Sequence, residues 1–357
     1  MNFKSKYLSK KDTPYFISEI GINHNGLLGM AIKMIRESKK SGFDAVKFQK
    51  RDAEDLLNFN IKPPSAIGYL SKTINDIPKS KTKFGGWTYP DIRLELNKTD
   101  YIKIKKFCKK IKIDLIVTPW DEKSVDFLKK LGIKCFKVAS IDANNFHFCE
   151  YVAKQKVPTI VSTGMCTMEE IKKTKKIFNN NKCPVMFMHC TSAYPSRDED
   201  KNLSAIPFMK KVLKTDIGFS GHGTGFTGTV GAIALGSPVI EKHSTLSTKM
   251  SGPDHAASLE FEKLKELIDI GRGVKRALGN PIKKKHKSEE ILHSILCRKF
   301  VVRKNIKKGS KLSKTNIKTA ITYKKGGITP NQYYRILNKK VFKDLKKGHI
   351  LSLKDFR

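Results

Sequence analysis

The chain has 357 residues, and its 71 Lys and Arg against 33 Asp and Glu give a formal net charge of +38. Hydrophobic residues make up 39% of the chain, which is sufficient for a core and excludes wholesale disorder. No segment approaches the roughly 20 apolar residues of a membrane-spanning helix, and the amino terminus has no apolar stretch of the signal-peptide type. We therefore expect a soluble, cytoplasmic protein without a membrane partner, built from one large and one small domain.

The positive charge comes mostly from lysine rather than arginine. The sequence has 61 Lys and 10 Arg, and Arg is the residue whose planar fork reads bases and phosphates. Lysines are spread over nearly every predicted helix, for example in 171–178. We therefore interpret them as solvated helix faces and predict no nucleic-acid partner, although their field favours small anionic substrates.

Eight short β-rich runs alternate with amphipathic segments along roughly the first 250 residues. The intervening segments, such as 28–42 and 121–132, carry apolar residues at helical spacing. The strand candidates are 14–22, 44–49, 114–119, 134–140, 158–164, 184–191, 216–222 and 238–245. Eight successive β/α units predict an α/β fold, a (β/α)8 TIM barrel rather than an open sheet.

The eight runs share an asymmetry, because each begins with apolar residues and ends in polar or ionisable ones. The end residues include Glu19, Lys47, Gln49, Thr118, Lys137, Ser140, Ser162, Thr163, His189, Ser220, His222, Glu241 and His243. In a TIM barrel the carboxyl ends of all strands gather on one face, where the chemistry takes place. The sequence therefore predicts an active site on that face.

One long connection interrupts the repeat. Residues 51–100 separate the second and third predicted strands and are far longer than the usual β/α connection. A segment of this length is either a functional lid or a disordered insertion. We expect a lid, because the segment leaves from the functional end of the barrel.

A different pattern follows the last predicted helix. Residues 299–317 are echoed by 339–356, and this internal repeat predicts a small β-rich domain of two related halves. The lysine-rich stretch before it is typical of a linker. The predicted organisation is a barrel over 1–280, a linker over 281–292 and the small domain over 293–357.

Lys47 and Lys137 lie within predicted strands, where Lys is seldom placed for solubility. Two inward lysines repel each other unless they are paired, so a bound multivalent anion is the simpler explanation, and a Schiff-base nucleophile is the alternative. Together with the hydroxyls at neighbouring strand ends, the two lysines resemble a binding site for an anion that carries a carboxylate and a phosphate. These hydroxyls belong to Thr118, Ser140, Ser162 and Ser220. Each hydroxyl alone is equally well explained as a turn cap.

Three further residues suggest chemistry at the barrel mouth. Glu19 ends the first strand, where a carboxylate can orient hydroxyls or move protons. His222 and His243 end adjacent strands, and two neutral imidazoles side by side can hold one divalent ion with open positions for substrate oxygens. The alternative is a pair of structural histidines.

At this point the motifs become recognisable. The segments SEIGINHNG, DAVKFQ, TPWDEKSVDFL, FKVAS, STGM, HCTSAYP, GFSGH, SPVIEKH and GPDHAAS occur in the order and spacing of the N-acetylneuraminate (sialic acid) synthase family, which the chain resembles over practically its whole length. The tail resembles the antifreeze-protein-like SAF domain of that family. The resemblance implies a transferase that condenses phosphoenolpyruvate with an N-acyl amino-hexose, N-acetylmannosamine or a related 6-deoxy-diamino sugar. The products are a nine-carbon 2-keto acid, a nonulosonic acid, and phosphate.

The resemblance also implies roles for individual residues. His222 and His243 match the ligands of a divalent metal, Mn²⁺ or Mg²⁺, and Glu19 and Asp254 match acceptor-side residues. The residues that match the phosphoenolpyruvate pocket are Lys47, Thr118, Lys137, Ser140, Ser162, Tyr194 and Ser220. Gln49, in the same motif as Lys47, is assigned to substrate binding. Glu19, Lys47, Lys137 and Asp254 are the implied catalytic residues.

The sequence departs from the family pattern in three segments. Gly221 stands where an Asp usually precedes the seventh-strand His, and Ser251 stands where Pro often precedes GPD. Tyr323 and Lys324 stand where the SAF domain usually offers an Arg to the N-acetyl group of the acceptor, so the acceptor is left open. In the family the SAF domain caps the barrel of the partner subunit, which implies a domain-swapped homodimer.

Two other hypotheses compete with this synthase. The first is another sugar aldolase, of the Schiff-base type, that uses Lys137. The second is a non-catalytic carbohydrate-binding or nucleic-acid-binding protein that uses its basic surface. The joint presence of Lys47, Lys137, His222 and His243 argues against the second, because an inactive barrel has no need of all four.

Overall fold

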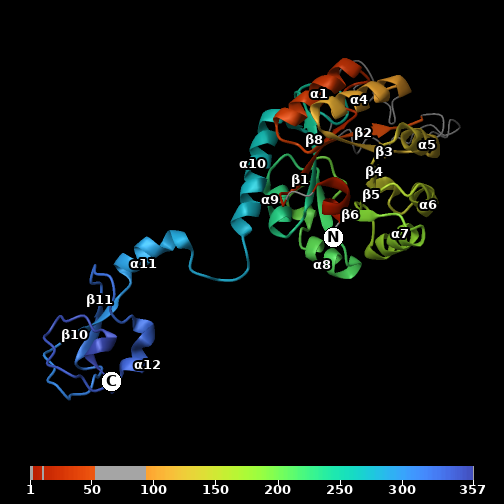
Figure 1. The fold of residues 1–357 in the computed structure, drawn as a ribbon. Helices are drawn as coiled ribbons and strands as arrows, with labels where there is room; N and C mark the ends of the chain where they lie inside the picture. Colours follow the sequence, from red (N-terminus) through yellow and green to blue (C-terminus); the bar gives the residue numbers. More distant parts are fainter. Residues whose placement is uncertain (1–2, 10–11, 53–93, 357) are drawn as a thin grey trace. The chain divides into compact units, whose positions relative to one another are not determined.

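The computed structural model describes residues 3–9, 12–52 and 94–356, and the chain divides into two compact units, Met1–Gly279 and Asn280–Arg357. The first unit is a closed barrel of parallel strands surrounded by helices (Figure 1). Its strands are β1 (Tyr15–Gly21), β2 (Ala45–Lys50), β3 (Asp114–Pro119), β4 (Phe136–Val138), β5 (Thr159–Ser162), β6 (Val185–Cys190), β7 (Ile217–Gly221) and β8 (Val239–Thr245). Each strand pairs with the next, and β8 pairs with β1 to close the ring. The predicted TIM barrel is confirmed.

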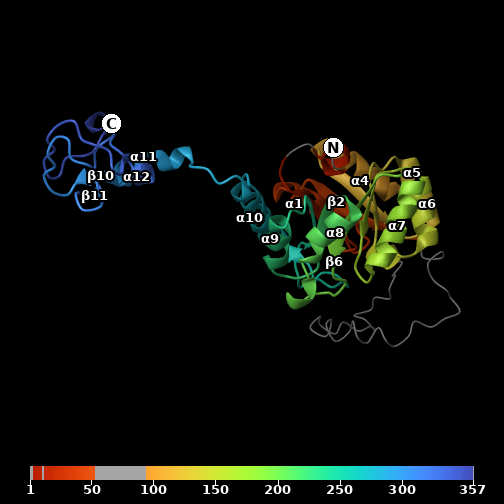
Figure 2. The same ribbon diagram turned by 90° about the horizontal axis from the view of Figure 1, so that it is seen from below.

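Helices follow the strands and cover the outside of the barrel. They are α1 (Leu28–Lys40), α4 (Lys98–Ile111), α5 (Glu122–Leu131), α6 (Phe146–Lys154), α7 (Met168–Asn180), α8 (Ala205–Leu213), α9 (Thr227–Ala234) and α10 (Phe261–Leu278). Polar side chains cap several of them: Asp121 accepts from the Ser124 N–H, and Thr167 forms a capping box with Glu170. Helices α5, α6 and α7 lie side by side around the barrel (Figure 2). A two-residue strand, β9 (Leu259–Glu260), pairs with β8.

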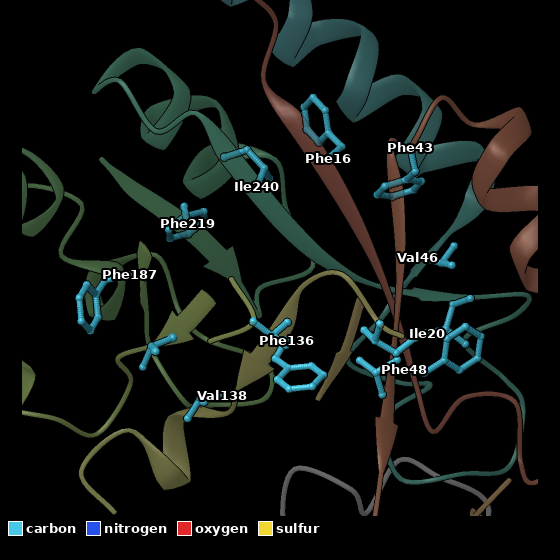
Figure 3. Packing of buried hydrophobic residues seen from close by; sticks show 14 of the residues in the cluster. Phe16, Ile20, Phe43, Val46, Phe48, Phe136, Val138, Phe187, Phe219 and Ile240 are labelled. Atoms are coloured by element: carbon cyan, nitrogen blue, oxygen red, sulfur yellow. The ribbon is translucent and has the colours of Figure 1, made fainter. Parts of the chain in front are cut away.

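The period-two alternation of the strands separates two cores. Outward-facing side chains such as Phe16, Phe136 and Ile240 pack against the helices (Figure 3). Inward-facing side chains fill the amino-terminal half of the barrel: Tyr15, Ile17, Ala45, Ile116, Cys135, Ile160, Met186, Met188 and Val239. Because successive side chains point to opposite faces, Glu19 continues the inward row of Ile17, and Glu241 and His243 continue that of Val239. The inward rows therefore change from apolar to ionisable toward the carboxyl ends of the strands.

The predicted lid over 51–100 falls mostly outside the described residues. Its described first residue, Arg51, is buried and forms an ion pair with Glu95, at 2.5 Å between Nε and Oε1. Helix α4 begins at Lys98, within the last part of the predicted lid. No helix in the described part of the chain is long and apolar enough to cross a membrane.

The second unit contains α11 (Glu290–Leu296), β10 (Lys299–Val302), β11 (Ile317–Ala320) and α12 (Tyr333–Ile336). Strands β10 and β11 pair antiparallel, and a separate apolar cluster, which includes Val302, Leu312, Ile336 and Leu351, forms its core. Much of the remaining backbone pairing consists of isolated bridges.

The two sequence repeats pair with each other in the second unit. Ile306 and Leu345 exchange both backbone hydrogen bonds, each at 2.8 Å. The Gly309 N–H donates to the Val341 carbonyl, and the Gly348 N–H donates to the Val302 carbonyl, also at 2.8 Å each. Leu345, Gly348 and Val341 in the second repeat correspond to Ile306, Gly309 and Val302 in the first, always at the same separation in the sequence. The repeat is thus a local two-fold arrangement in which each half completes the hydrogen bonds of the other.

Candidate active site

The predicted site residues of the barrel come together at the carboxyl ends of its strands. The strand register aligns Glu19 with Lys47 and with His243, and Ser220 with Glu241. All five side chains are buried. Ionisable groups concentrated at this depth must be paired, because burying a lone charge is costly.

Two lysines and two glutamates form an ion-pair network at the centre of this face. Lys47 Nζ lies 2.9 Å from Glu19 Oε2 and 3.4 Å from Glu241 Oε1. Lys137 Nζ lies 3.6 Å from the same Glu241 oxygen. The two lysines are therefore bridged by a carboxylate of the protein itself, so a bound anion is not needed to explain their proximity.

The charges of this network are set by burial and by the partners. Burial opposes ionisation of Glu241, but Lys137 and Lys47 lower its pKa to about 2. Burial alone would lower the pKa of Lys47, and Glu19 and Glu241 raise it above its usual value. Burial lowers the pKa of Lys137, against the opposing effect of Glu241. Glu241 thus stays ionised and holds both ammonium groups in the pocket.

Hydroxyl groups surround the two lysines. Lys137 Nζ donates to Ser162 Oγ at 2.6 Å, and Lys47 Nζ lies 3.3 Å from Thr118 Oγ1. The Ser220 hydroxyl donates to Glu241 Oε1 at 3.1 Å. Ammonium groups and hydroxyls that converge in this way offer several hydrogen-bond donors to the oxygens of one small anion.

The two candidate metal ligands lie beside each other. The ring centroids of His222 and His243 are 5.6 Å apart, and Tyr194 stacks on His222 at 4.3 Å. The Nδ1–H of His222 donates to the Thr191 carbonyl at 2.7 Å, which places the lone pair on Nε2, where the Tyr194 and Ser220 hydroxyls each lie 3.4 Å away. Burial lowers the pKa of His222 to about 4 and that of His243 well below its usual value. Both rings are therefore neutral at pH 7, the form in which histidine binds a metal.

These residues fit a divalent metal with open coordination positions. His222 offers an oriented Nε2, and the buried Oε2 of Glu241 has no hydrogen-bond partner in the described part of the chain. In residues 3–9, 12–52 and 94–356, no group of three or more His, Cys, Asp and Glu side chains is placed so that it could hold a metal ion by itself. Two imidazoles with room for water and substrate oxygens suit an exchangeable catalytic ion rather than a structural one.

Gly221, which stands next to His222 where the family usually has an Asp, is closely packed. A Cβ at this position would lie 2.8 Å from the Phe219 ring, so a larger side chain requires the ring to move. The orientation of His222 comes instead from the Thr191 carbonyl. This backbone contact supplies the support that a neighbouring carboxylate would give.

A second pair of carboxylates lies on the β1 and β8 side of the mouth. Gln49 Nε2 donates to Glu19 Oε1 at 2.8 Å, which fixes the orientation of Glu19. Asp254 Oδ2 lies 3.8 Å from His243 Nδ1. Burial, and secondly the charge of Glu19, raise the pKa of Asp254 to about 6. Oxygens of this kind accept hydrogen bonds from the hydroxyls of a sugar.

Some residues of this face were not among the predicted site residues. Glu241 was noted only as a polar strand end, although the period-two pattern places it on the same face as His243. Cys190, Gly164 and Ser192 lie next to Ser140, and their types carried no signal in the sequence. Tyr323 and Lys324 belong to the second unit, where both are exposed.

Comparisons with known proteins identify relatives that match over most of the chain. The NeuB family model matches residues 34–283. The N,N'-diacetyllegionaminic acid synthase of Campylobacter jejuni is 36% identical over 338 residues, which cover 94% of this chain and 98% of that protein. The human N-acetylneuraminate-9-phosphate synthase is 36% identical over 333 residues, 92% of this chain and 88% of that protein. A crystal structure of N-acetylneuraminic acid synthetase from Leptospira borgpetersenii superimposes with a TM-score of 0.67 at 28% identity and covers 78% of this chain and 90% of that one.

Proposed function

The chain belongs to the NeuB family, and we propose that it is a nonulosonic acid synthase. It joins phosphoenolpyruvate, an amino-hexose and water into a nine-carbon 2-keto acid and releases phosphate. The observation that carries this proposal is the joint placement of two bridged lysines and two neutral histidines at one barrel mouth. The lysines suit an anionic donor, and the histidines suit a metal that binds a sugar aldehyde.

The donor pocket consists of Lys47, Lys137 and the surrounding hydroxyls. The lysine ammonium groups bind the carboxylate and phosphate oxygens of phosphoenolpyruvate, and Glu241 holds them in place before the donor arrives. The hydroxyls assigned to the same anion are Thr118, Ser140, Ser162, Tyr194 and Ser220. Fixed donors of this kind also stabilise the charge on the departing phosphate, because they require little rearrangement during the reaction.

His222 and His243 are assigned to a divalent ion, Mn²⁺ or Mg²⁺. When bound, such an ion polarises the aldehyde of the open-chain sugar as a Lewis acid. Tyr194 covers one face of His222 and keeps its ring in position. The burial of both rings lowers their pKa values and keeps the imidazoles neutral.

The acceptor binds next to the donor, against Glu19 and Asp254. These carboxylates accept hydrogen bonds from sugar hydroxyls, and Gln49 keeps Glu19 oriented for that contact. The methylene carbon of phosphoenolpyruvate then attacks the aldehyde carbon. Water adds to the resulting cation, and the tetrahedral intermediate expels phosphate, so no covalent bond to Lys137 is formed.

The small domain predicted over 293–357, which lies in the second unit, is assigned as an SAF domain that covers the acceptor site of the partner subunit in a cytoplasmic homodimer. Its paired repeats and its exposed Tyr323 and Lys324 support this assignment. Lys324 cannot reproduce the bidentate contact of the Arg expected in that segment. We therefore assign the acceptor as an amino-hexose that differs from N-acetylmannosamine at or near the N-acyl group.

Phosphate release tests the proposal. The full-length protein is mixed with phosphoenolpyruvate, Mn²⁺ and a panel of N-acyl amino-hexoses, and phosphate release and a 2-keto acid product are expected for at least one sugar. Absence of phosphate with every sugar contradicts the proposal. Trapping of Lys137 by borohydride in the presence of a keto substrate supports the Schiff-base aldolase instead.

A further inference from the structure

We propose that Cys190 is a positioning residue of the donor pocket, whose thiol fixes the Ser140 hydroxyl as a hydrogen-bond donor to the substrate. This inference rests on the proposed function, because it assigns a role inside the phosphoenolpyruvate pocket. Cys190 ends strand β6 and is 5% exposed. Met186, Met188 and Cys190 are alternate residues of β6, so Cys190 faces the barrel interior as the two methionines do. It is the last of the three and lies nearest the polar carboxyl ends of the strands.

Cys190 and Gly164 both contact the Ser140 side chain. Cys190 Sγ lies 3.1 Å from Ser140 Oγ. The Gly164 N–H donates to Ser140 Oγ at 3.1 Å and to Cys190 Sγ at 3.1 Å. The three groups therefore form one small hydrogen-bonded cluster beside Lys137 and Ser162.

The cluster requires glycine at position 164. A Cβ there would lie 2.2 Å from Ser192 Oγ, 3.0 Å from Ser140 Oγ and 3.1 Å from Cys190 Sγ. The first of these distances is too short for a Cβ and the other two are tight, and glycine lets the backbone amide approach Ser140 and Cys190. The cluster is thus a packed arrangement with fixed positions for its polar atoms.

The hydrogen bonds of this cluster determine where the proton of the Ser140 hydroxyl points. The Ser140 hydroxyl has two acceptor lone pairs and one proton. The Gly164 N–H occupies one lone pair, and in the arrangement we propose the S–H of Cys190 occupies the other. The proton of Ser140 is then directed to an oxygen of the bound anion. A thiol suits this task because it is a weak acceptor that does not compete strongly for the same proton.

The hydroxyl of Ser192 lies beside the cluster and can serve as a second donor to the anion that we propose. Its Oγ is buried, lies next to the same cluster, and has no hydrogen-bond partner in the described residues. A buried hydroxyl without a partner is costly, and the cost disappears when a ligand oxygen accepts its proton. Ser140 and Ser192 thus offer two hydroxyl donors at one place.

Steady-state kinetics on three variants test the role of the thiol. Cys190→Ala is expected to raise the KM for phosphoenolpyruvate about five- to tenfold, the range of one neutral hydrogen bond, with a smaller change in kcat. Cys190→Ser is expected to restore part of the loss, because its O–H also donates. Cys166→Ala is the matched control: Cys166 is a neighbouring thiol whose nearest partner is the Ser140 carbonyl, at 4.0 Å, and wild-type kinetics are expected.

A spectroscopic measurement separates positioning from mere packing. The S–H stretching band of Cys190 is identified in the infrared difference between wild type and Cys190→Ala. Phosphoenolpyruvate is expected to shift that band to lower wavenumber, because a Ser140 hydroxyl that donates to the anion becomes a better acceptor. An unchanged KM in Cys190→Ala or an unshifted band, in an enzyme that releases phosphate, overturns the inference. A wild-type protein that releases no phosphate overturns the proposed function and this inference with it.

Discussion

Lysine has two different roles in this chain, and they belong to two different regions. The second unit carries 23 of the 71 Lys and Arg residues but 4 of the 33 Asp and Glu, and its described lysines are all exposed except Lys299. At the barrel mouth, Lys47 and Lys137 are 4% and 2% exposed and share the Glu241 carboxylate. The comparison teaches that burial with a carboxylate partner, rather than the number of lysines, distinguishes a functional charge from a solvated one.

The largest effect is expected at the histidines of the mouth. His222→Ala or His243→Ala removes one of the two proposed metal ligands, and we expect phosphate release to become undetectable while the fold is retained. An assay of phosphate release measures the activity, a titration with Mn²⁺ measures metal binding, and circular dichroism checks that the fold is retained. The exposed His293 of the second unit provides the control, and His293→Ala should leave activity unchanged. Normal turnover in either mouth variant rules out the metal assignment.

The mouth lysines should give the next largest effect. Lys47→Met and Lys137→Met each remove a charge-assisted contact worth about 1.5 to 3 kcal/mol, which corresponds to a roughly 10- to 150-fold loss of kcat/KM for phosphoenolpyruvate. Replacement of the exposed Lys346 by Gln should leave kcat/KM unchanged.

The two lysine variants should differ in stability, which sharpens the comparison within the mouth. Lys47 pairs with both Glu19 and Glu241, whereas Lys137 pairs with Glu241 alone in the described structure. Loss of Lys47 leaves the buried Glu19 without its cation, so Lys47→Met should lower the Tm more than Lys137→Met does. Equal Tm values for the two variants contradict the assigned pairing.

The sequence predicted the barrel because eight short β-rich runs alternate with helical patterns, and the polar ends that these runs share predicted Glu19, Lys47 and His243 on one face. It did not predict how the charges pair. The bridge by Glu241 depends on the closure of β8 onto β1, which brings together residues more than 190 positions apart. The cluster of Ser140, Gly164 and Cys190 likewise arises from three different strand ends, and no local pattern marks it.

A smaller effect is expected from removal of the whole second unit. Deletion of 280–357 removes the most basic region but none of the proposed donor-binding residues. The barrel should stay folded, because its core clusters are formed by its own side chains. Phosphoenolpyruvate affinity should persist, and kcat/KM for the sugar should fall by about tenfold or more through an uncovered site. Calorimetric binding and sugar kinetics test this, and loss of phosphoenolpyruvate binding with a folded barrel contradicts the division of roles.

The smallest effect is expected on the stability of the second unit. Among the described residues of that unit, only one carboxylate is buried. Asp355 is 1% exposed, and its Oδ2 accepts from the Ser352 N–H at 2.8 Å and lies 2.9 Å from His349 Nε2. Burial opposes its ionisation, but His349 and the other donors lower its pKa below the usual value. A lowered pKa means that the stabilisation is fully present above the ordinary Asp pKa of about 4 and is lost as the pH falls through the lower, folded-state value.

Hydrogen exchange on the full-length protein measures this contribution. At pH 6, Asp355→Asn should reduce the protection of amides in 339–356 relative to wild type, because the neutral amide replaces an ionised acceptor. The difference should shrink as the pH falls below 4 and through the lower folded-state pKa, where Asp355 itself becomes protonated. Asp344→Asn is the matched control, since Asp344 is exposed: its ion pair with Lys307, at 3.1 Å, is worth little, and the amide oxygen of Asn can still accept from the Lys308 N–H, now at 2.8 Å. If the difference in amide protection between wild type and Asp355→Asn does not depend on pH, Asp355 stabilises the unit through packing rather than through its charge. The distinction between buried, paired charges and solvated charges would then hold for the barrel mouth but not for the second unit.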